Sequence, residues 1–479
     1  MKKKIMIASC VIFFLTSQAQ AVTRLVKAGG GTGFSNTIAS ALTNCLPGDI
    51  VEICDNSLYI ESLTLDTPYI ILRGASGYRP AVTFSGTGIP ALYIKTNNVV
   101  VRNLNVSSSS VTWNNSVILI TASHNSVQDC RITGDSMIWT NTGIRISSMS
   151  NEISNCDIGN NLYYGINLNG ALYTRIQNND IHDCRTGVYG IGDQTLINFN
   201  IIRNIQGEGL FLAGMGVNSI IYNLLYLCSS SAILIDAAMA PYNIIHNTIT
   251  KNSTGIMVQY MSSPNSDIIN NIIYDNGTDL YLNGLGQSPV VNINNNCYSH
   301  SQIFNLNMPQ NIHINNSVSD PPEFINSSLN DFHLSQTSPC IDAGTDIGGL
   351  DPNAIIREPA NQRDIGFYET TLSTTTNLPQ ITDNIRISAN NLYPGKTARV
   401  ELFDLNKISE KPIYVKAGIY DMQARLIRTL CETPVSPFGT FVFSWDGKDK
   451  NNQYVGAGIY FLKIQINDQV KRIKLFFLQ

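Results

Sequence analysis

One short phrase recurs about every 23 residues through the middle of this chain and restricts the folds open to it. Each phrase has an apolar anchor, followed five places later by a second apolar residue. Steps of 21 to 26 residues separate nine anchors: Val101, Val127, Ile153, Ile176, Ile197, Ile220, Ile244, Ile268 and Ile293. Such a repeat predicts a solenoid, because each unit can bury its apolar face only against its neighbours.

A second phrase runs in step with the first and indicates the local structure. Gly or Ala followed by alternating apolar residues begins at Gly143, Gly165, Gly187, Gly209, Ala232 and Gly255. This alternation has the period of a strand, so we expect at least two short strands per coil and an all-β fold. Leucine-rich repeats need a Leu-x-x-Leu-x-Leu phrase and steadier spacing, and this chain has neither.

The residue three places after each anchor predicts the interior of the coils. Asparagine holds this position in six successive repeats: Asn179, Asn200, Asn223, Asn247, Asn271 and Asn296. Stacked about 4.8 Å apart, their amides can form an internal hydrogen-bond ladder. Cys130 and Cys156 hold the same position earlier, where a small buried thiol fits. Cys45 and Cys54 flank a turn and could instead form a disulfide in an oxidising compartment.

The ends of the repeat resemble the right-handed parallel β-helix (pectin-lyase-like) superfamily. Residues 37–42 and 47–53 resemble its N-terminal cap, and residues 69–74 its first full coil. Residues 338–344 and 363–369 are similar to the closing segment of secreted bacterial members. The resemblance covers residues 22–369 and implies a right-handed parallel β-helix solenoid. It implies no single function, since this scaffold carries lyases, hydrolases, epimerases and adhesins.

The N-terminus indicates export. Three lysines precede an apolar run over residues 5–15, and Ala19-Gln20-Ala21 offers a small-x-small cleavage site. Residues 1–21 therefore predict a signal peptide and a secreted or cell-surface, extracellular protein. The alternative is a lipoprotein box that would place a lipid on Cys10. No later apolar run reaches the roughly 18 residues of a membrane span, so we predict no transmembrane segment in the mature chain.

The C-terminal region predicts a separate module. Residues 370–380 read as a linker, and residues 381–479 as the strands and turns of a small Ig-like β-sandwich. Residues 445–449 and 458–461 resemble the Ig-like domain of flagellar hook-capping proteins and type IX secretion sorting domains. The resemblance implies contact with secretion or sorting machinery, or surface anchoring. A plain spacer is the alternative, and residues 476–479 depart from the usual basic ending.

One outward column carries the predicted metal and catalytic residues. Four places after successive anchors stand Arg131, Asp157 and Asp180. Two neighbouring carboxylates can hold Ca²⁺, which makes Asp157 and Asp180 the predicted metal ligands, and Arg131 can neutralise a uronate. His182 and Asp183 follow at once, and a His beside an Asp suits general-base work. We therefore predict catalysis by Asp180, His182, Asp183 and Arg131. The alternative is a surface ion-pair ladder with an idle, solvated histidine.

Other residues extend this candidate site. Arg185, Tyr189 and Phe211 are predicted to bind substrate, because outward aromatic rings can stack on sugars. Ring stacks between coils are the alternative. Lys251 is a lone candidate base, or a plain surface charge.

Composition limits the classes of molecule that this chain can bind. Charged residues make up 14% of the chain and the net charge is -4, with no basic stripe for nucleic acid. A long, flat β-helix face suits polysaccharide or a cell-surface glycan. Two functions remain open: a polysaccharide lyase or glycoside hydrolase, and a non-catalytic, adhesin-like or structural glycan-binding protein. The Asp-Asp pair of polygalacturonases and the Asp-Pro-His of mannuronan epimerases are missing, so the sequence leaves this choice open.

Overall fold

The computed structural model forms two compact units, Met1–Leu372 and Ser373–Gln479. It describes residues 21–108, 115–134, 141–214, 218–237, 239–260, 266–283, 290–299, 303–305, 312–345, 347, 363–368, 385–387, 391–392, 397–402, 413–421, 425–435, 441–466 and 469–477. The predicted signal peptide up to residue 20, the alternative lipid site at Cys10 and the predicted linker at 370–380 lie outside these residues. Among the described residues, no helix is long and apolar enough to cross a membrane.

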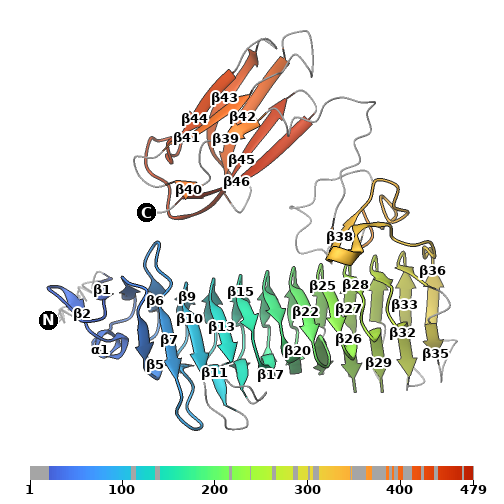
Figure 1. Ribbon diagram of the computed structural model, residues 1–479, viewed down its shortest axis with the longest axis horizontal. Helices are drawn as coiled ribbons and strands as arrows, with labels where there is room; N and C mark the ends of the chain where they lie inside the picture. Colours follow the sequence, from blue (N-terminus) through green and yellow to red (C-terminus); the bar gives the residue numbers. More distant parts are fainter. Residues whose placement is uncertain are drawn as a thin grey trace, which may run out of the picture. The chain divides into compact units, whose positions relative to one another are not determined.

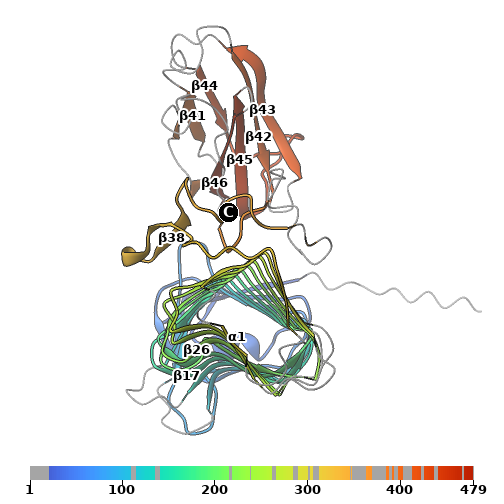
Figure 2. The same ribbon diagram turned by 90° about the vertical axis from the view of Figure 1, so that its right-hand side faces the viewer.

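The first unit is a parallel β-helix in which each complete coil gives one strand to each of three sheets, A, B and C, and sheet A has further strands at its two ends (Figures 1 and 2). Sheet A contains β1 (Thr23–Val26), β2 (Phe34–Ser35), β3 (Ile50–Ile53), β6 (Ile71–Gly74), β9 (Val100–Arg102), β12 (Ser126–Gln128), β15 (Glu152–Ser154), β18 (Arg175–Gln177), β21 (Leu196–Asn198), β24 (Asn218–Ile221), β27 (Tyr242–Ile245), β30 (Ser266–Ile269), β33 (Val291–Asn294) and β36 (Ile312–Asn315). The anchors of the first phrase point inward from these strands.

Sheets B and C complete each coil. Sheet B contains β4 (Leu58–Ile60), β7 (Ala81–Phe84), β10 (Asn105–Ser108), β13 (Arg131–Gly134), β16 (Asp157–Gly159), β19 (Asp180–His182), β22 (Ile201–Ile205), β25 (Leu224–Cys228), β28 (Thr248–Thr250), β31 (Ile272–Tyr274) and β34 (Cys297–Tyr298). Sheet C contains β5 (Leu63–Leu65), β8 (Leu92–Ile94), β11 (Ser116–Ile120), β14 (Thr142–Ile146), β17 (Leu162–Leu172), β20 (Cys184–Asp193), β23 (Leu210–Ala213), β26 (Ser231–Asp236), β29 (Thr254–Gln259), β32 (Thr278–Asn283) and β35 (Ile303–Asn305).

The predicted asparagine ladder is confirmed at the inner corner between sheets A and B. Each backbone N–H from Asn179 to Asn271 donates to the side-chain Oδ1 of the next ladder residue at 2.8–3.0 Å. Each Nδ2 donates to that same Oδ1 and to carbonyls of the neighbouring coil, as Asn223 does to Ile197 O at 2.9 Å. The ladder therefore gives hydrogen-bond partners to buried polar groups that would otherwise lack them at this corner.

The nine described cysteines all carry free thiols. Cys130 and Cys156 are buried, as predicted, and Cys156 joins the ladder by donating its N–H to Asn179 Oδ1 at 2.9 Å. The Sγ of Cys45 donates to Ala41 O, and that of Cys54 donates to Glu52 O. The disulfide considered for Cys45 and Cys54 is therefore not formed in this structure.

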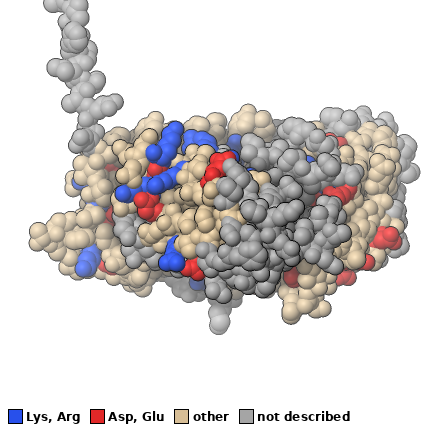
Figure 3. Space-filling view, turned by 90° about the horizontal axis from the view of Figure 1, so that it is seen from above, with Lys and Arg blue, Asp and Glu red and all other residues tan. Residues whose placement is uncertain are grey.

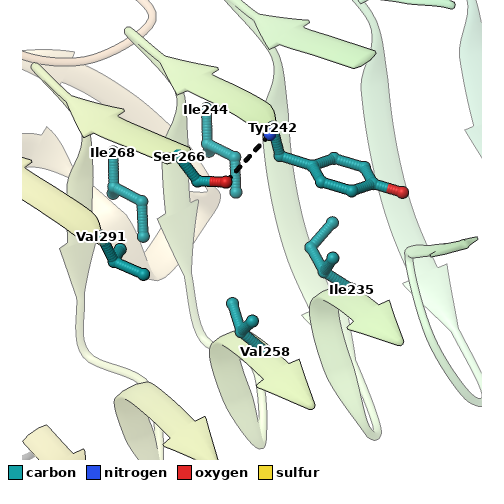
Figure 4. A pocket seen from close by; sticks show the side chains of 7 residues that line it. All are labelled: Ile235, Tyr242, Ile244, Val258, Ser266, Ile268 and Val291. Carbon is teal, nitrogen blue, oxygen red and sulfur yellow. Dashed lines mark hydrogen bonds between the residues drawn. The ribbon is translucent and has the colours of Figure 1, made fainter. Parts of the chain in front are cut away.

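The core between the sheets is apolar and tightly filled. One cavity, of about 10 Å³, lies between inward residues of sheets A and C (Figure 4). It is lined by Ile235, Tyr242, Ile244, Val258, Ser266, Ile268 and Val291. A space of this size holds no more than a single water, so this cavity is too small for a sugar.

The N-terminal end of the β-helix is covered by α1 (Ile38–Leu42), which packs on β1, β3 and β5 (Figure 2). The hydroxyl of Thr37 accepts the Ser40 N–H at 3.1 Å, which caps the first turn. The carboxylate of Glu61 accepts the N–H groups of Ile38 and Ala39. This helix is the cap that the resemblance implied.

Near the other end, the chain turns back over the outside of sheet B. We call residues 318–345 and 363–368 the closing segment; it contains β37 (Phe324–Asn326), the 3₁₀ turn Ser327–Leu329 and β38 (Asp331–Leu334). Its residues Leu334, Cys340 and Ile365 bury the outward side chains Ile272 and Cys297. The last coils of sheet B are thus covered, whereas the outward side chains of Arg131, Asp157 and Asp180 remain partly exposed.

The second unit is a small β-sandwich. One antiparallel sheet contains β39 (Ile385–Ile387), β41 (Ala398–Leu402) and β44 (Phe441–Trp445). The other contains β40 (Asn391–Leu392), β46 (Gln469–Phe477), β45 (Gly458–Ile466), β42 (Ile413–Tyr420) and β43 (Leu426–Val435). Side chains from both sheets, among them Val400, Trp445 and Ile464, form one core. The expected fold class, an all-β solenoid followed by a small sandwich, is confirmed.

Candidate functional site

The outward column predicted from the sequence lies on sheet B. Arg131 is the register partner of Asp157, and Asp157 that of Asp180, so the three residues stand on consecutive coils. Their inward neighbours Ile132 and Ile158 are buried, which directs the charged side chains outward. The side chains of Arg131, Asp157 and Asp180 are 51%, 40% and 40% exposed.

Each carboxylate of this column faces a cation. Arg131 Nε lies 3.3 Å from Asp157 Oδ2. Arg203, on β22, donates to both oxygens of Asp180 at 3.0 and 2.8 Å. Burial tends to lower the pKa of the Arg203 guanidinium, but the hydrogen bonds and charge of Asp180 outweigh burial and raise it. The arrangement is the surface ion-pair ladder considered as the alternative.

His182 is held between two carboxylates. Its Nε2 lies 2.8 Å from Asp157 Oδ1, and its Nδ1 lies 2.7 Å from Asp183 Oδ2. A Cβ on Gly159 would lie 2.9 Å from the imidazole, so only glycine leaves room for the ring here. Since both nitrogens are occupied, the geometry favours a positioning role for His182 over free general-base work.

The predicted calcium ligands do not fit the ion as they are arranged. Ca²⁺ takes six to eight oxygen ligands. The oxygens of Asp157 already face Arg131 and His182, and those of Asp180 face Arg203. Within the described ranges, no cluster of three His, Cys, Asp or Glu side chains could hold a metal. We therefore derive no chemistry from a metal at these carboxylates.

Beyond His182 the site continues around the corner from sheet B to sheet C. The guanidinium of Arg185 lies 4.9 Å from the ring centre of Tyr163, which meets Tyr164 edge-on at 4.6 Å. Tyr164 stacks on Tyr189 at 4.3 Å, and Tyr189 stacks on Phe211 at 5.0 Å. Burial and the neighbouring tyrosines raise the pKa of Tyr164 to about 12. These rings turn their faces to one another between coils, so a ligand meets chiefly their edges.

Arg185 differs from the other cations of the site. Its side chain is exposed, and among the described residues no carboxylate forms an ion pair with it. Glu208, on the next coil, instead accepts hydrogen bonds from Thr186 at 3.4 Å and Ser230 at 3.3 Å. Arg185 therefore presents a guanidinium fork that is steadied by an aromatic ring and open to an anionic ligand.

Lys251, considered as a lone base, lies away from this cluster. Its Nζ donates to Ser327 O and, at 3.2 Å, to Asn330 Oδ1, and it lies over the Phe332 ring. All three partners belong to the closing segment. Lys251 therefore fastens that segment to the coils.

Sequence reasoning missed several members of the site, although a signal was present. Residues six places after the anchors form a second outward column: Thr133, Gly159, His182, Arg203 and Tyr226. Aligning this column would have found Gly159 and Arg203. The partner of Arg185, Tyr163, stands two places before Gly165, just as Arg185 stands two places before Gly187, so the second phrase carried this signal.

The comparisons with known proteins agree with this fold. A family model described as a right-handed β-helix region matches residues 88–240. Pectate lyase Pel9A is similar in structure, with a TM-score of 0.54 and 15% identity, covering 73% of this chain and 97% of that chain. A mannuronic-acid-specific family 6 lyase from human gut microbiota has a TM-score of 0.40, 12% identity and coverages of 62% and 83%. The Azotobacter vinelandii mannuronan C-5 epimerase AlgE6 A-module has a TM-score of 0.39, 13% identity and coverages of 60% and 94%.

No curated protein matches the chain. The family model and the pectate lyase structure together show that the first unit folds as a right-handed parallel β-helix.

Proposed function

We propose that this chain is a secreted or cell-surface protein that binds an acidic polysaccharide along its β-helix. The observation that carries the proposal is Arg185, an exposed guanidinium that lies on Tyr163 without a carboxylate partner among the described residues. Arginine pairs with carboxylates through two parallel hydrogen bonds, which suits a uronate. Pectate is a polymer of uronates. Pectate lyase Pel9A, which is named for it, shares the β-helix fold with this chain.

The charges around Arg185 suit a polyanion. Asp157 and Asp180 would repel one, but they lie against Arg131 and Arg203. On the face drawn in Figure 3, the charged side chains that are described lie in small groups among uncharged ones. The two ion pairs reduce the repulsion that a polyanion meets as it approaches the site.

A binding experiment tests this role. Affinity electrophoresis with uronate and neutral polysaccharides would compare the full chain with Arg185→Ala and Arg185→Lys. Losing a charge-assisted pair costs about 1.5–3 kcal/mol, so Arg185→Ala should bind a uronate polymer at least about tenfold more weakly. Arg185→Lys should recover only part of this, because an ammonium lacks the planar fork. Arg175→Ala, an exposed arginine on sheet A, is the matched control; equal losses in both alanine variants would contradict the assignment.

Cleavage by Asp180, His182, Asp183 and Arg131, the activity predicted from the sequence, is a separate proposal. The pectate-lyase-like fold and the contact between His182 and Asp183 support it, while the pairing of Asp180 with Arg203 favours binding alone. Ultraviolet absorbance of unsaturated uronates and reducing-end release would be followed on the same polysaccharides. Product that disappears in Asp183→Asn would support catalysis; no product from any polymer that binds would leave a non-catalytic glycan-binding protein.

For the second unit we propose sorting or surface attachment through an Ig-like sandwich. Its core is built from its own two sheets, so it can serve as an independent module. In the host, a chain lacking residues 373–479 should lose its normal sorting or surface attachment and still bind polysaccharide. An unchanged location would indicate a spacer.

A further inference from the structure

Left-handed backbone positions recur where the coils turn, and most hold Asn or Asp. A bulky residue is unfavourable there, since only glycine, asparagine and aspartate adopt this conformation readily. Phe199, Tyr222 and His246 nevertheless occupy such positions between sheets A and B, with φ of 54–56°. An aromatic side chain at these positions should therefore make contacts whose stabilisation offsets the free-energy cost of the left-handed backbone.

For Tyr222 that use is visible. Its ring stacks between Phe199 and His246, at 5.1 and 4.9 Å, and is fully buried. The closing segment covers this stack: Phe367 packs against it, and Arg363 donates to the Tyr222 hydroxyl at 3.2 Å. Within this molecule, aromatic residues at left-handed turns thus serve as docking points.

Three tyrosines occupy left-handed turns at a different corner, where sheet C leads to sheet A. Tyr69, Tyr173 and Tyr260 have φ of 63°, 53° and 51°, and they are 60%, 51% and 67% exposed. Among the described residues, Gln194 makes the one recorded polar side-chain contact, donating to the Tyr173 hydroxyl at 3.2 Å. These rings carry the same backbone cost as Tyr222, yet no described segment buries them.

Their spacing along the helix is regular. Tyr69 follows β5, Tyr173 follows β17 and Tyr260 follows β29, and each of these strands lies four strands from the next in sheet C. With about 4.8 Å per strand, neighbouring tyrosines are roughly 19 Å apart along the axis that runs horizontally in Figure 1. Other left-handed turns of this corner lie between Tyr69 and Tyr173 and just after Tyr173. They hold uncharged or weakly basic side chains: Asn98, His124, Ser150 and Gln194.

We propose that Tyr69, Tyr173 and Tyr260 form a row of aromatic platforms for the sugar rings of one extended polysaccharide chain. The inference rests on the proposed function and adds a second contact region to Arg185. Exposed tyrosine rings bind the apolar faces of sugars while the hydroxyl stays in water, and the amides and hydroxyls between them suit sugar hydroxyls. A globular partner would need a contiguous apolar patch, which rings so far apart do not form.

The test replaces all three tyrosines by asparagine in the full chain. Asparagine tolerates left-handed backbone, so Tyr69→Asn/Tyr173→Asn/Tyr260→Asn should unfold at the wild-type temperature or above it. Its affinity for the polysaccharide that the wild type retains should fall at least about tenfold. Tyr78→Asn, which removes an exposed tyrosine outside the row, is the matched control and should bind like the wild type.

Three outcomes would overturn the inference. Unchanged affinity in the triple variant, with loss in Arg185→Ala, would sink the tyrosine row and leave the proposed function standing. A changed oligomeric state in size-exclusion chromatography with unchanged affinity would make the row a contact between copies of the chain. A wild-type chain that no polysaccharide retains would overturn both proposals.

Discussion

Among single residues, His182 shows how a neighbour without a side chain can define a site. Its ring lies over Gly159 and reaches Asp157 on one side and Asp183 on the other. The sequence marks His182 and Asp183 as adjacent, and adjacency alone would suggest a solvated pair. The missing side chain on the preceding coil leaves room for the ring beside Gly159, where only 11% of the His182 side chain is exposed.

We expect Gly159→Ala to break this arrangement. The new Cβ would lie 2.3 Å from His182 O and 2.9 Å from the ring, so backbone or imidazole must move. Overpacking of this kind costs about 1–3 kcal/mol, which urea unfolding of the β-helix would measure. Asn243→Ala, an outward change on β27 of the same unit, should alter β-helix stability by less than about 0.5 kcal/mol. Comparable losses in both variants would contradict the steric explanation.

Asp49 should give the N-terminal cap a pH dependence. Burial tends to raise its pKa, but hydrogen bonds from the Leu46 and Val22 N–H groups and from Arg24 outweigh burial and lower it below 3.8. Because the pKa of Asp49 is lower in the folded than in the unfolded chain, its carboxylate stabilises the fold at pH values above the unfolded pKa of about 4. This stabilisation is lost as the pH falls through the pKa of the folded state. Asp49→Asn should therefore cost about 1–3 kcal/mol at neutral pH, and the difference from wild type should shrink below about pH 4. A difference that stays constant with pH would exclude this explanation.

Among the secondary-structure elements, the corner ladder explains why short strands of three to five residues suffice. The backbone N–H and the side-chain Nδ2 of Asn200 both donate to Asn223 Oδ1, and the same two groups of Asn223 donate to Asn247 Oδ1. Each coil is thereby bonded to the next at the corner as well as along the strands. Ladder residues stay in contact although the coils between them vary from 21 to 25 residues in length.

Removing one step of the ladder should be costly. Asn223→Ala leaves the buried Asn200 N–H without the side-chain oxygen that accepts it. Leaving a buried donor unsatisfied costs about 1–3 kcal/mol, and a loss in this range is expected in denaturant unfolding. Asn243→Ala, on the outward side of β27, should change stability by less than about 0.5 kcal/mol. A small effect at Asn223 would show that the corner relaxes or admits water.

At the scale of the whole molecule, two features determine how the chain unfolds and which surface is exposed: its division into two units and the return of the closing segment over sheet B. The β-helix core and the sandwich core share no residues, so each unit should unfold separately. Within the first unit, the closing segment decides which part of sheet B meets solvent. It buries Ile272 and Cys297 and leaves Asp157 and Asp180 open.

Calorimetry should show this independence. We expect the full chain to have two transitions, and a chain ending at Leu372 to keep the β-helix transition at the same temperature within about 2 °C. Loss of the sandwich would then remove only its own transition. A β-helix that melts markedly lower after truncation would mean that the units stabilise each other.

The sequence by itself determined the solenoid, its register and the asparagine ladder. A period of one coil forces equivalent residues into contact, and strand alternation then tells inside from outside, which is why Arg131, Asp157 and Asp180 could be aligned. Only the tertiary structure decided what those residues touch. Arg203 and Tyr163 stand on coils next to Asp180 and Arg185, but the repeat does not say which side chains meet across those coils. Ser327 reaches Lys251 from 76 residues away, in a segment outside the repeat. Periodicity fixes which Cα atoms are neighbours, whereas side-chain length, glycine gaps and a returning segment fix which charges meet.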